Sequence, residues 1–134
     1  MAEQDVDLKS YFESNRGLGV LSTADAGGRV DAAVFSRPHV LAEDEVAFIM
    51  PDRLTHHNLQ SNPHAAYLFR EEAPGYRGVR LYLTRLREEE NSELLQTLRR
   101  GPHAGEKGDA SDPRFLVVFR VERILPLVGD GRRP

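Results

Sequence analysis

Alternation of apolar and polar residues along the chain predicts a protein built mainly from β-strands. The apolar runs either repeat with a period of two or are short and wholly apolar, and turn-forming residues separate them. Six strands are predicted, at Leu18–Thr23, Arg29–Leu41, Val46–Met50, His64–Glu71, Val79–Arg87 and Arg114–Val128. Because short turns join most of them, consecutive antiparallel pairing is favoured, and closure into a barrel would remove the exposed edges of the sheet.

Three short helices are predicted beside the strands, at Asp5–Asn15, Thr55–Ser61 and Glu88–Arg100. Thr55 is the expected N-cap of the second helix, and Asn62-Pro63 is expected to end it. The third helix is expected to begin in the solvated run Glu88–Glu90, since acidic side chains are favourable at a helix N-terminus.

The chain is expected to form one domain over residues 1–134, because this length supports one core but not two. Residues 1–16 would carry the N-terminal helix. Residues 101–112 are rich in glycine and polar residues and are expected to form an exposed loop, and residues 129–134 are expected to form a tail.

The predicted strand Arg29–Leu41 contains one irregularity. Pro38 has no backbone N–H to donate, so the strand is expected to lie at an edge or to carry a bulge there. Its side chains alternate, with Val34 and Ser36 on one face and Phe35 and Arg37 on the other. A bulge at this point would turn Ser36 and Arg37 toward a site.

Composition narrows the classes of function. The absence of cysteine excludes disulfides, zinc–cysteine sites and thiol catalysis. A formal net charge of -3 disfavours a nucleic-acid partner. No apolar run approaches the roughly 20 residues that span a bilayer, and the N-terminus does not resemble a secretory signal, so no membrane partner and a cytoplasmic location are expected.

Other common site chemistries find little support. The neighbours His56 and His57 would point about 100° apart on a helix and could not chelate one metal ion, so no metal site is predicted. Ser22 and Ser36 lie in predicted strands and not in a G-x-S-x-G elbow, which disfavours hydrolase chemistry. No general acid or base can be assigned, and the catalytic residues are left unknown.

An anion site is one interpretation of the segment that leads into the second helix. The segment offers the Arg53 guanidinium and the Thr55 hydroxyl beside a helix N-terminus, which carries about half a positive charge. The alternative is that Thr55 only caps the helix and Arg53 is solvated. Arg37 and Arg80, both in predicted strands, would either lie along the surface or clamp an anion or an electron-rich ring.

Three sequence blocks, taken in their order, carry a family resemblance. They are Gly17–Thr23, Val30–Pro38, and Arg53–Leu59 followed by Asn62-Pro63. Over about Leu8 to Val128 the chain resembles the pyridoxamine 5'-phosphate oxidase-related family of FMN-binding split barrels. The resemblance implies a six-stranded antiparallel Greek-key split β-barrel with short flanking helices. It also implies a homodimer that binds two FMN molecules at the subunit interface.

The resemblance further implies which residues bind the cofactor. They are Val34, Phe35, Ser36 and Arg37 along the isoalloxazine ring, Arg53, Thr55 and Asn58 around the ribityl phosphate, and Arg80 on the strand that closes the site. The remaining partner would be a small-molecule electron donor or substrate.

One departure from the family bears on the activity. Its true oxidases carry a C-terminal segment in which an arginine and a histidine engage the substrate, and Leu127–Pro134 shows no counterpart. We therefore expect an FMN-dependent oxidoreductase of another substrate, not a vitamin B6 oxidase. Two alternatives stay open: a non-catalytic FMN or electron-transfer protein, and a haem-binding or haem-degrading protein with His39, His56 or His64 as axial ligand.

Overall fold

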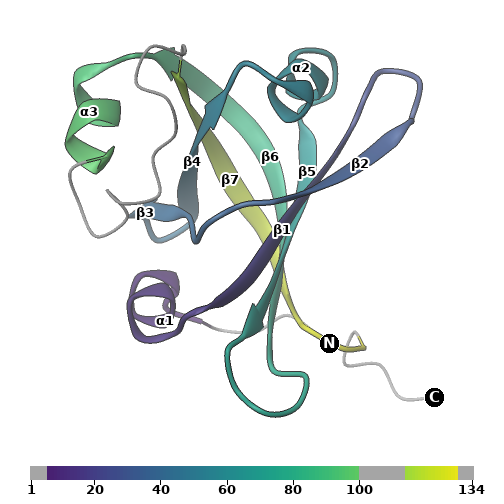
Figure 1. Cartoon of the computed structure of the whole chain (residues 1–134), viewed down its shortest axis with the longest axis vertical. Coiled ribbons are helices and arrows are strands. Elements are labelled where there is room, and N and C mark those ends of the chain that lie inside the picture. Colours follow the sequence, from purple (N-terminus) through teal and green to yellow (C-terminus); the bar gives the residue numbers. More distant parts are fainter. Residues whose placement is uncertain (1–5, 100–113, 130–134) are drawn as a thin grey trace.

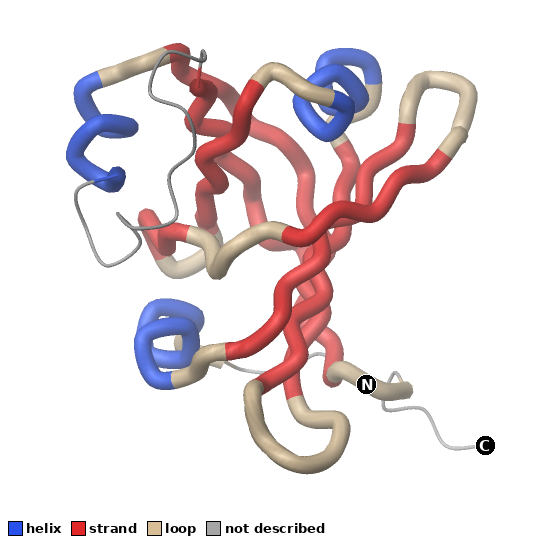
Figure 2. The backbone as a smooth tube through the Cα atoms, viewed as in Figure 1, coloured by secondary structure: helices blue, strands red, loops and turns tan. Residues whose placement is uncertain are grey.

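The computed structural model describes residues 6–99 and 114–129, and this part of the chain forms one seven-stranded antiparallel sheet with three short helices (Figures 1 and 2). The strands are β1 Gly17–Ala24, β2 Val30–Val34, β3 His39–Ala42, β4 Glu45–Pro51, β5 His64–Glu71, β6 Gly78–Glu90 and β7 Arg114–Pro126. The helices are α1 Leu8–Ser14, α2 Leu54–Ser61 and α3 Glu93–Arg99. The mainly-β prediction is confirmed, and the predicted loop at 101–112 lies outside the described residues.

The order of the strands explains how the sheet curls. It runs β2-β1-β5-β6-β7-β4-β3, so the two edge strands, β2 and β3, are consecutive in the chain. Only residues 35–38 connect them, and a connection of that length spans at most roughly 18 Å. The sheet therefore has to bend until its edges approach each other, which gives a barrel that is split between β2 and β3.

The predicted strand Arg29–Leu41 is two strands, and this is why the structure has seven strands where six were expected. The backbone pairs with β1 through Val34, and Phe35 N–H still donates to Gly19 O at 3.0 Å. Beyond that point the chain leaves the sheet, and Pro38 contributes no donor that could hold it there. The predicted alternation nevertheless continues: Val34 and Ser36 are exposed, whereas Phe35 and Arg37 are partly buried.

A buried hydroxyl fixes the connection between the two edges. The Tyr67 side chain rises from β5, is fully buried, and places Oη 3.0 Å from Ser36 O and 3.2 Å from Phe35 O. Gly19 makes this reach possible, because a Cβ at that position would lie 1.9 Å from Tyr67 Oη. A side chain at position 19 would thus displace the Tyr67 hydroxyl, which holds the barrel closed.

The core fills the barrel with large apolar side chains. Phe48, Tyr67, Phe69 and Phe119 are buried in one cluster, and edge-on contacts such as Phe48–Phe119, with ring centroids 6.0 Å apart, connect them. A smaller cluster around Leu95 lies under α3. Burial of this apolar area is the main stabilising contribution to the fold.

The third helix begins later than predicted, and the acidic run before it is part of a strand. β6 continues to Glu90, which pairs with Phe115 of β7. Asn91 then turns the chain with a positive φ of 46°, and Ser92 Oγ accepts a hydrogen bond from Leu95 N–H at 3.1 Å. Pairing with the long apolar strand β7 overrides the helix-forming preference of the glutamates.

We predict that Tyr67→Phe lowers the free energy of unfolding by about 1–2 kcal/mol, because the carbonyls of Phe35 and Ser36 lose their buried donor. Urea denaturation followed by circular dichroism measures the change. Tyr76→Phe is the matched control, since the Tyr76 ring is 75% exposed. An equal loss in both variants would contradict the closing role of the Tyr67 hydroxyl.

Candidate functional site

The start of α2 has no side-chain cap. Arg53, in an extended conformation, is the N-cap residue, and its side chain accepts no hydrogen bond from the first turn. The first helical bond, from His57 N–H to Arg53 O, is 2.9 Å. Backbone N–H groups of the first turn therefore point toward the end of the helix without a capping side chain, the arrangement that suits an anion.

The predicted N-cap role of Thr55 is wrong. Thr55 lies inside the first turn of α2 and is 7% exposed. The helix begins one residue earlier than predicted because the extended backbone of Arg53, with φ −132° and ψ −164°, already serves as the cap. The helix itself and its end at Ser61 are confirmed.

Asn58, the third residue of the predicted phosphate site, points toward the barrel. Its side chain is buried, and Nδ2 donates to Thr23 Oγ1 of β1 at 3.1 Å. This buried pair attaches α2 to the sheet. The structure thus brings Arg53 and Thr55 together at the helix start and uses the Asn58 amide elsewhere.

Arg37 is engaged with the N-terminal helix. Its Nη1 donates to Phe12 O at 2.7 Å and to Asn15 O at 3.0 Å, at the end of α1. A cation is favourable at a helix C-terminus, where carbonyl oxygens lack partners. This contact holds the segment that follows Val34 against α1 and leaves Ser36 exposed beside it.

Val34 and Arg80, two of the predicted ring-contacting residues, lie in one cross-strand row. Val34 is opposite Val20, Val20 is opposite Leu68, and Leu68 is opposite Arg80. Residues opposite one another in neighbouring strands share a face of the sheet. Arg80 is held there by hydrogen bonds from its guanidinium to the carbonyls of Pro126, at 2.9 Å, and Gly129.

The same face of the sheet exposes a group of large apolar side chains. We call it the outer apolar face and define it by Leu18, Val20, Val30, Val34 and Leu68, from β1, β2 and β5. Val30 is 78% exposed, Val34 71%, Leu18 52% and Leu68 38%. Single exposed apolar residues are ordinary, but a contiguous group on one sheet face marks a surface for a ligand or another protein chain.

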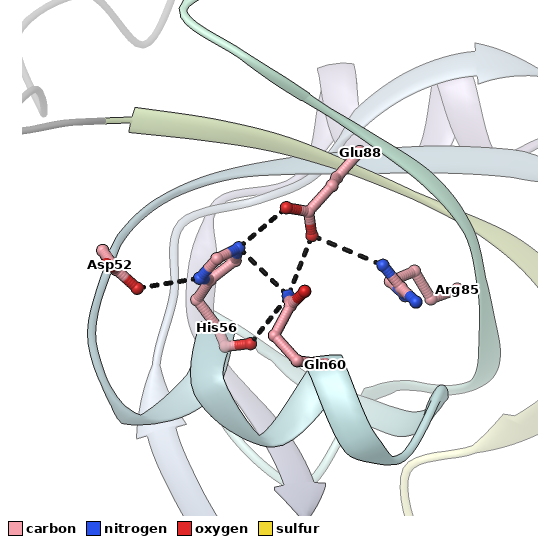
Figure 3. Close-up of polar contacts among 5 residues, drawn as sticks. All are labelled: Asp52, His56, Gln60, Arg85 and Glu88. Atoms are coloured by element: carbon pink, nitrogen blue, oxygen red, sulfur yellow. Dashed lines mark hydrogen bonds and ion pairs between the residues drawn. The ribbon is translucent and has the colours of Figure 1, made fainter.

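A polar network that the sequence did not predict surrounds His56 (Figure 3). His56 Nδ1 lies 2.9 Å from Asp52 Oδ1, and Nε2 lies 3.0 Å from Glu88 Oε2 of β6. His56 is 6% exposed, and its imidazole stacks on Phe115 of β7, with centroids 3.8 Å apart and planes 13° apart. The i, i+4 spacing of Asp52 and His56 was a local signal for this pair. The contact between His56 and Glu88 was missed because Glu88 was assigned to a helix.

The network changes the acidity of Glu88. Burial by itself raises the pKa of this carboxyl, but hydrogen bonds from Gln60 and His56 and the charges of His56 and Arg85 outweigh it and hold the pKa below its usual value. The Gln60 and Arg85 contacts to Glu88 Oε1 are 3.0 and 3.4 Å. Ionised Glu88 therefore stabilises the junction between α2 and β6.

Comparison with known proteins identifies the fold. No protein-family profile and no curated protein sequence matches the chain. Among solved structures, an FMN-binding protein from Syntrophomonas wolfei matches 92% of this chain and 85% of its own, with a TM-score of 0.70 and 20% identity. A protein from Lactobacillus delbrueckii provisionally classed as a pyridoxamine 5'-phosphate oxidase matches 93% of this chain and 99% of its own, with a TM-score of 0.67 and 17% identity. The fold is that of the pyridoxamine 5'-phosphate oxidase-like split barrels.

The split-barrel fold occurs with other ligands too. HutZ, described as a haem storage protein from Vibrio cholerae, matches 92% of this chain and 95% of its own, with a TM-score of 0.63 and 18% identity. Likeness at these identities establishes the fold and leaves the ligand open. Within residues 6–99 and 114–129, no helix is long and apolar enough to cross a membrane, and no group of three or more acidic or histidine side chains is arranged to hold a metal ion.

We predict that Glu88→Gln lowers the free energy of unfolding by about 1–2 kcal/mol at neutral pH, because hydrogen bonds to a charged group are lost. The pKa of Glu88 is lowered in the folded protein, so its contribution is present above the ordinary glutamate pKa of about 4.3 and is lost as the pH falls through the lowered value. The difference between the unaltered protein and the variant should shrink on acidification.

Urea denaturation between about pH 7 and pH 3 measures this difference. Glu89→Gln is the matched control, since Glu89 is the next residue of β6 and its carboxylate lies 3.8 Å from Arg87 Nε, outside the His56 network. A loss in Glu88→Gln that stays constant over the whole pH range would contradict the assignment.

Proposed function

We propose that the protein is a cytoplasmic FMN-binding flavoprotein that acts as a homodimeric oxidoreductase. The observation that carries this proposal is the uncapped start of α2, with Arg53 and Thr55 beside it, in a fold shared with an FMN-binding protein. A flavin needs an anion site for its phosphate and an apolar face for its ring. The start of α2 and the exposed part of the segment from Val34 to Arg37 support the proposal on these two points.

The phosphate would bind at the start of α2. Backbone N–H groups of the first turn, the Thr55 hydroxyl and the guanidinium of the exposed residue Arg53 are donors that lie there. Hydrogen bonds to a charged group are stronger than neutral ones, and a guanidinium can bind a phosphate with two parallel N–H groups. Asn58 would support the site by attaching the helix to Thr23, not by touching the phosphate.

The isoalloxazine ring would lie along the segment from Val34 to Arg37. Val34 and Ser36 are exposed there, and Phe35 packs edge-on against Phe48, with centroids 5.9 Å apart. Hydrogen bonds from Tyr67 to Ser36 O and from Arg37 to Phe12 O hold the backbone of this segment in place, which suits the binding of a planar ring. Bound FMN would supply the electron transfer, and these residues would bind and orient it.

A second copy of the chain would cover the outer apolar face. Four of its members are large side chains with between 38% and 78% of their surface exposed. A flat apolar surface on one side of a sheet suits a twofold interface, in which the same patch serves both partners. Arg80 lies at the end of the Val34–Val20–Leu68 row, where it could reach a ligand bound by the partner chain.

Haem is the second candidate ligand, because the haem storage protein HutZ shares the fold. Of the possible axial ligands, His56 has both ring nitrogens within 3.0 Å of carboxylate oxygens and would have to give up one of these contacts to bind iron. His64 is exposed at the start of β5 and lies 3.5 Å from Thr84 Oγ1. The occupied His56 ring favours FMN over haem bound at α2.

We predict that Arg53→Gln and Thr55→Val each weaken FMN binding by about 1–3 kcal/mol, the range for lost hydrogen bonds to a charged group. Titration of FMN fluorescence quenching gives the dissociation constants. Thr55→Ser keeps the hydroxyl and should keep the affinity.

Arg29→Gln is the control for Arg53→Gln, since Arg29 is an exposed arginine in the β1–β2 hairpin and its loss changes the net charge equally. The phosphate assignment would be contradicted if both Arg53→Gln and Thr55→Val bound FMN as tightly as the unaltered protein.

We predict that Val34→Glu converts a dimer into a monomer, because each interface would then bury a charge without a partner. Size-exclusion chromatography with light scattering measures the molar mass. Leu94→Glu is the control, since Leu94 is partly exposed on α3, across the molecule from β2 (Figure 1). A monomeric unaltered protein, or monomers in both variants, would contradict the proposed interface.

A further inference from the structure

Both ring nitrogens of His56 face carboxylate oxygens. Nδ1 lies 2.9 Å from Asp52 Oδ1, and Nε2 lies 3.0 Å from Glu88 Oε2. An ionised carboxylate only accepts hydrogen bonds, and a neutral imidazole has one N–H and one acceptor nitrogen. A neutral ring would therefore place one bare nitrogen against a carboxylate oxygen, whichever tautomer it adopted.

The amide of Gln60 does not resolve this conflict. Its Nε2 lies 3.0 Å from Glu88 Oε1, 3.1 Å from His56 O and 3.1 Å from His56 Nε2. One amide hydrogen serves Glu88 Oε1, and the other lies between His56 O and His56 Nε2; even if it served Nε2, the bare lone pair of that nitrogen would still lie 3.0 Å from Glu88 Oε2. Rotating the amide would place its oxygen against Glu88 Oε1 and His56 O. The two carboxylate contacts together favour an N–H on His56 Nε2 as well as on Nδ1.

The surroundings of His56 suit a planar cation. Phe115 of β7 covers one face of the ring in a parallel stack, and an aromatic face attracts positive charge. Asp52 approaches from the segment before α2 and Glu88 from β6, with Arg85 of β6 on the far side of Glu88 (Figure 3). When His56 is protonated, these charges cancel.

We propose that His56 is a buried imidazolium and a positioning residue, whose charge offsets Asp52 and Glu88 and keeps the start of α2 suited to an anion. The identity of that anion as the FMN phosphate rests on the proposed function. A cation in the first turn opposes the helix dipole, so the two carboxylates are needed to hold it there. A neutral His56 would leave an uncompensated negative charge close to the anion.

Protonation and anion binding should therefore favour each other. If the charge of His56 increases the affinity for an anion, then a bound anion must increase the proton affinity of His56 by the same factor. The expected effect of one charge on a nearby dianion in a largely aqueous setting is about three- to tenfold in affinity.

The charge of His56 can be read from the ring nitrogens of the unaltered protein by ¹⁵N–¹H NMR at about pH 7, where an ordinary histidine is mostly neutral. Both His56 nitrogens should show the shift of protonated nitrogen. His57, exposed on the same helix, is the internal reference. An unprotonated nitrogen in His56 at this pH would overturn the proposal without any variant.

His56→Gln and His57→Gln then test the positioning role at the same pH. In His56→Gln, Asp52 and Glu88 lose the charge that offsets them, and we expect the dissociation constant for FMN to rise about three- to tenfold. His57→Gln, which removes an exposed ring from the same helix, should leave the dissociation constant unchanged. Unchanged FMN affinity in folded His56→Gln would overturn the positioning role. No FMN binding to the unaltered protein would overturn the proposed function, while the ring-nitrogen shifts would still decide whether His56 is an imidazolium.

Discussion

The short connection between β2 and β3 is the constraint on which the rest of the structure depends. Residues 35–38 join the two edges of one antiparallel sheet, so the sheet closes on itself and encloses the aromatic core. The Tyr67 hydroxyl, which reaches from β5 to the carbonyls of Phe35 and Ser36, holds this closure. Closure also turns the other side of β1, β2 and β5 outward, which creates the outer apolar face.

Most strands could be predicted from the sequence, because apolar and polar residues alternate along a strand that has one face buried. Two predictions about the strands were wrong: the single strand Arg29–Leu41 and the helix start at Glu88–Glu90. Exposed and partly buried side chains keep alternating through Arg37 although the backbone has left the sheet. Pro38 indicated an irregularity in this strand but did not show that pairing ends at Val34. Glu88–Glu90 look like a helix start, yet β7 pairs with them as a strand.

The part of the candidate site that consists of sequence neighbours could be predicted. Arg53 and Thr55 lie at a strand-to-helix junction that the local sequence pattern predicts, and the structure places both at the start of α2. Contacts between distant residues were out of reach: Arg37 with the end of α1, and His56 with Glu88. These contacts position the site. The first fixes the backbone beneath the proposed ring surface, and the second sets the charge at the proposed phosphate end.

The central claim is that this split barrel binds a flavin with its phosphate at α2. The visible absorption spectrum of the purified protein, recorded after incubation with FMN, a deazaflavin or haem and gel filtration, tests it most directly. We expect flavin bands to be retained at about one FMN per chain and to be lost in Arg53→Gln. A retained haem Soret band with no flavin, or a colourless protein after all three incubations, would contradict it.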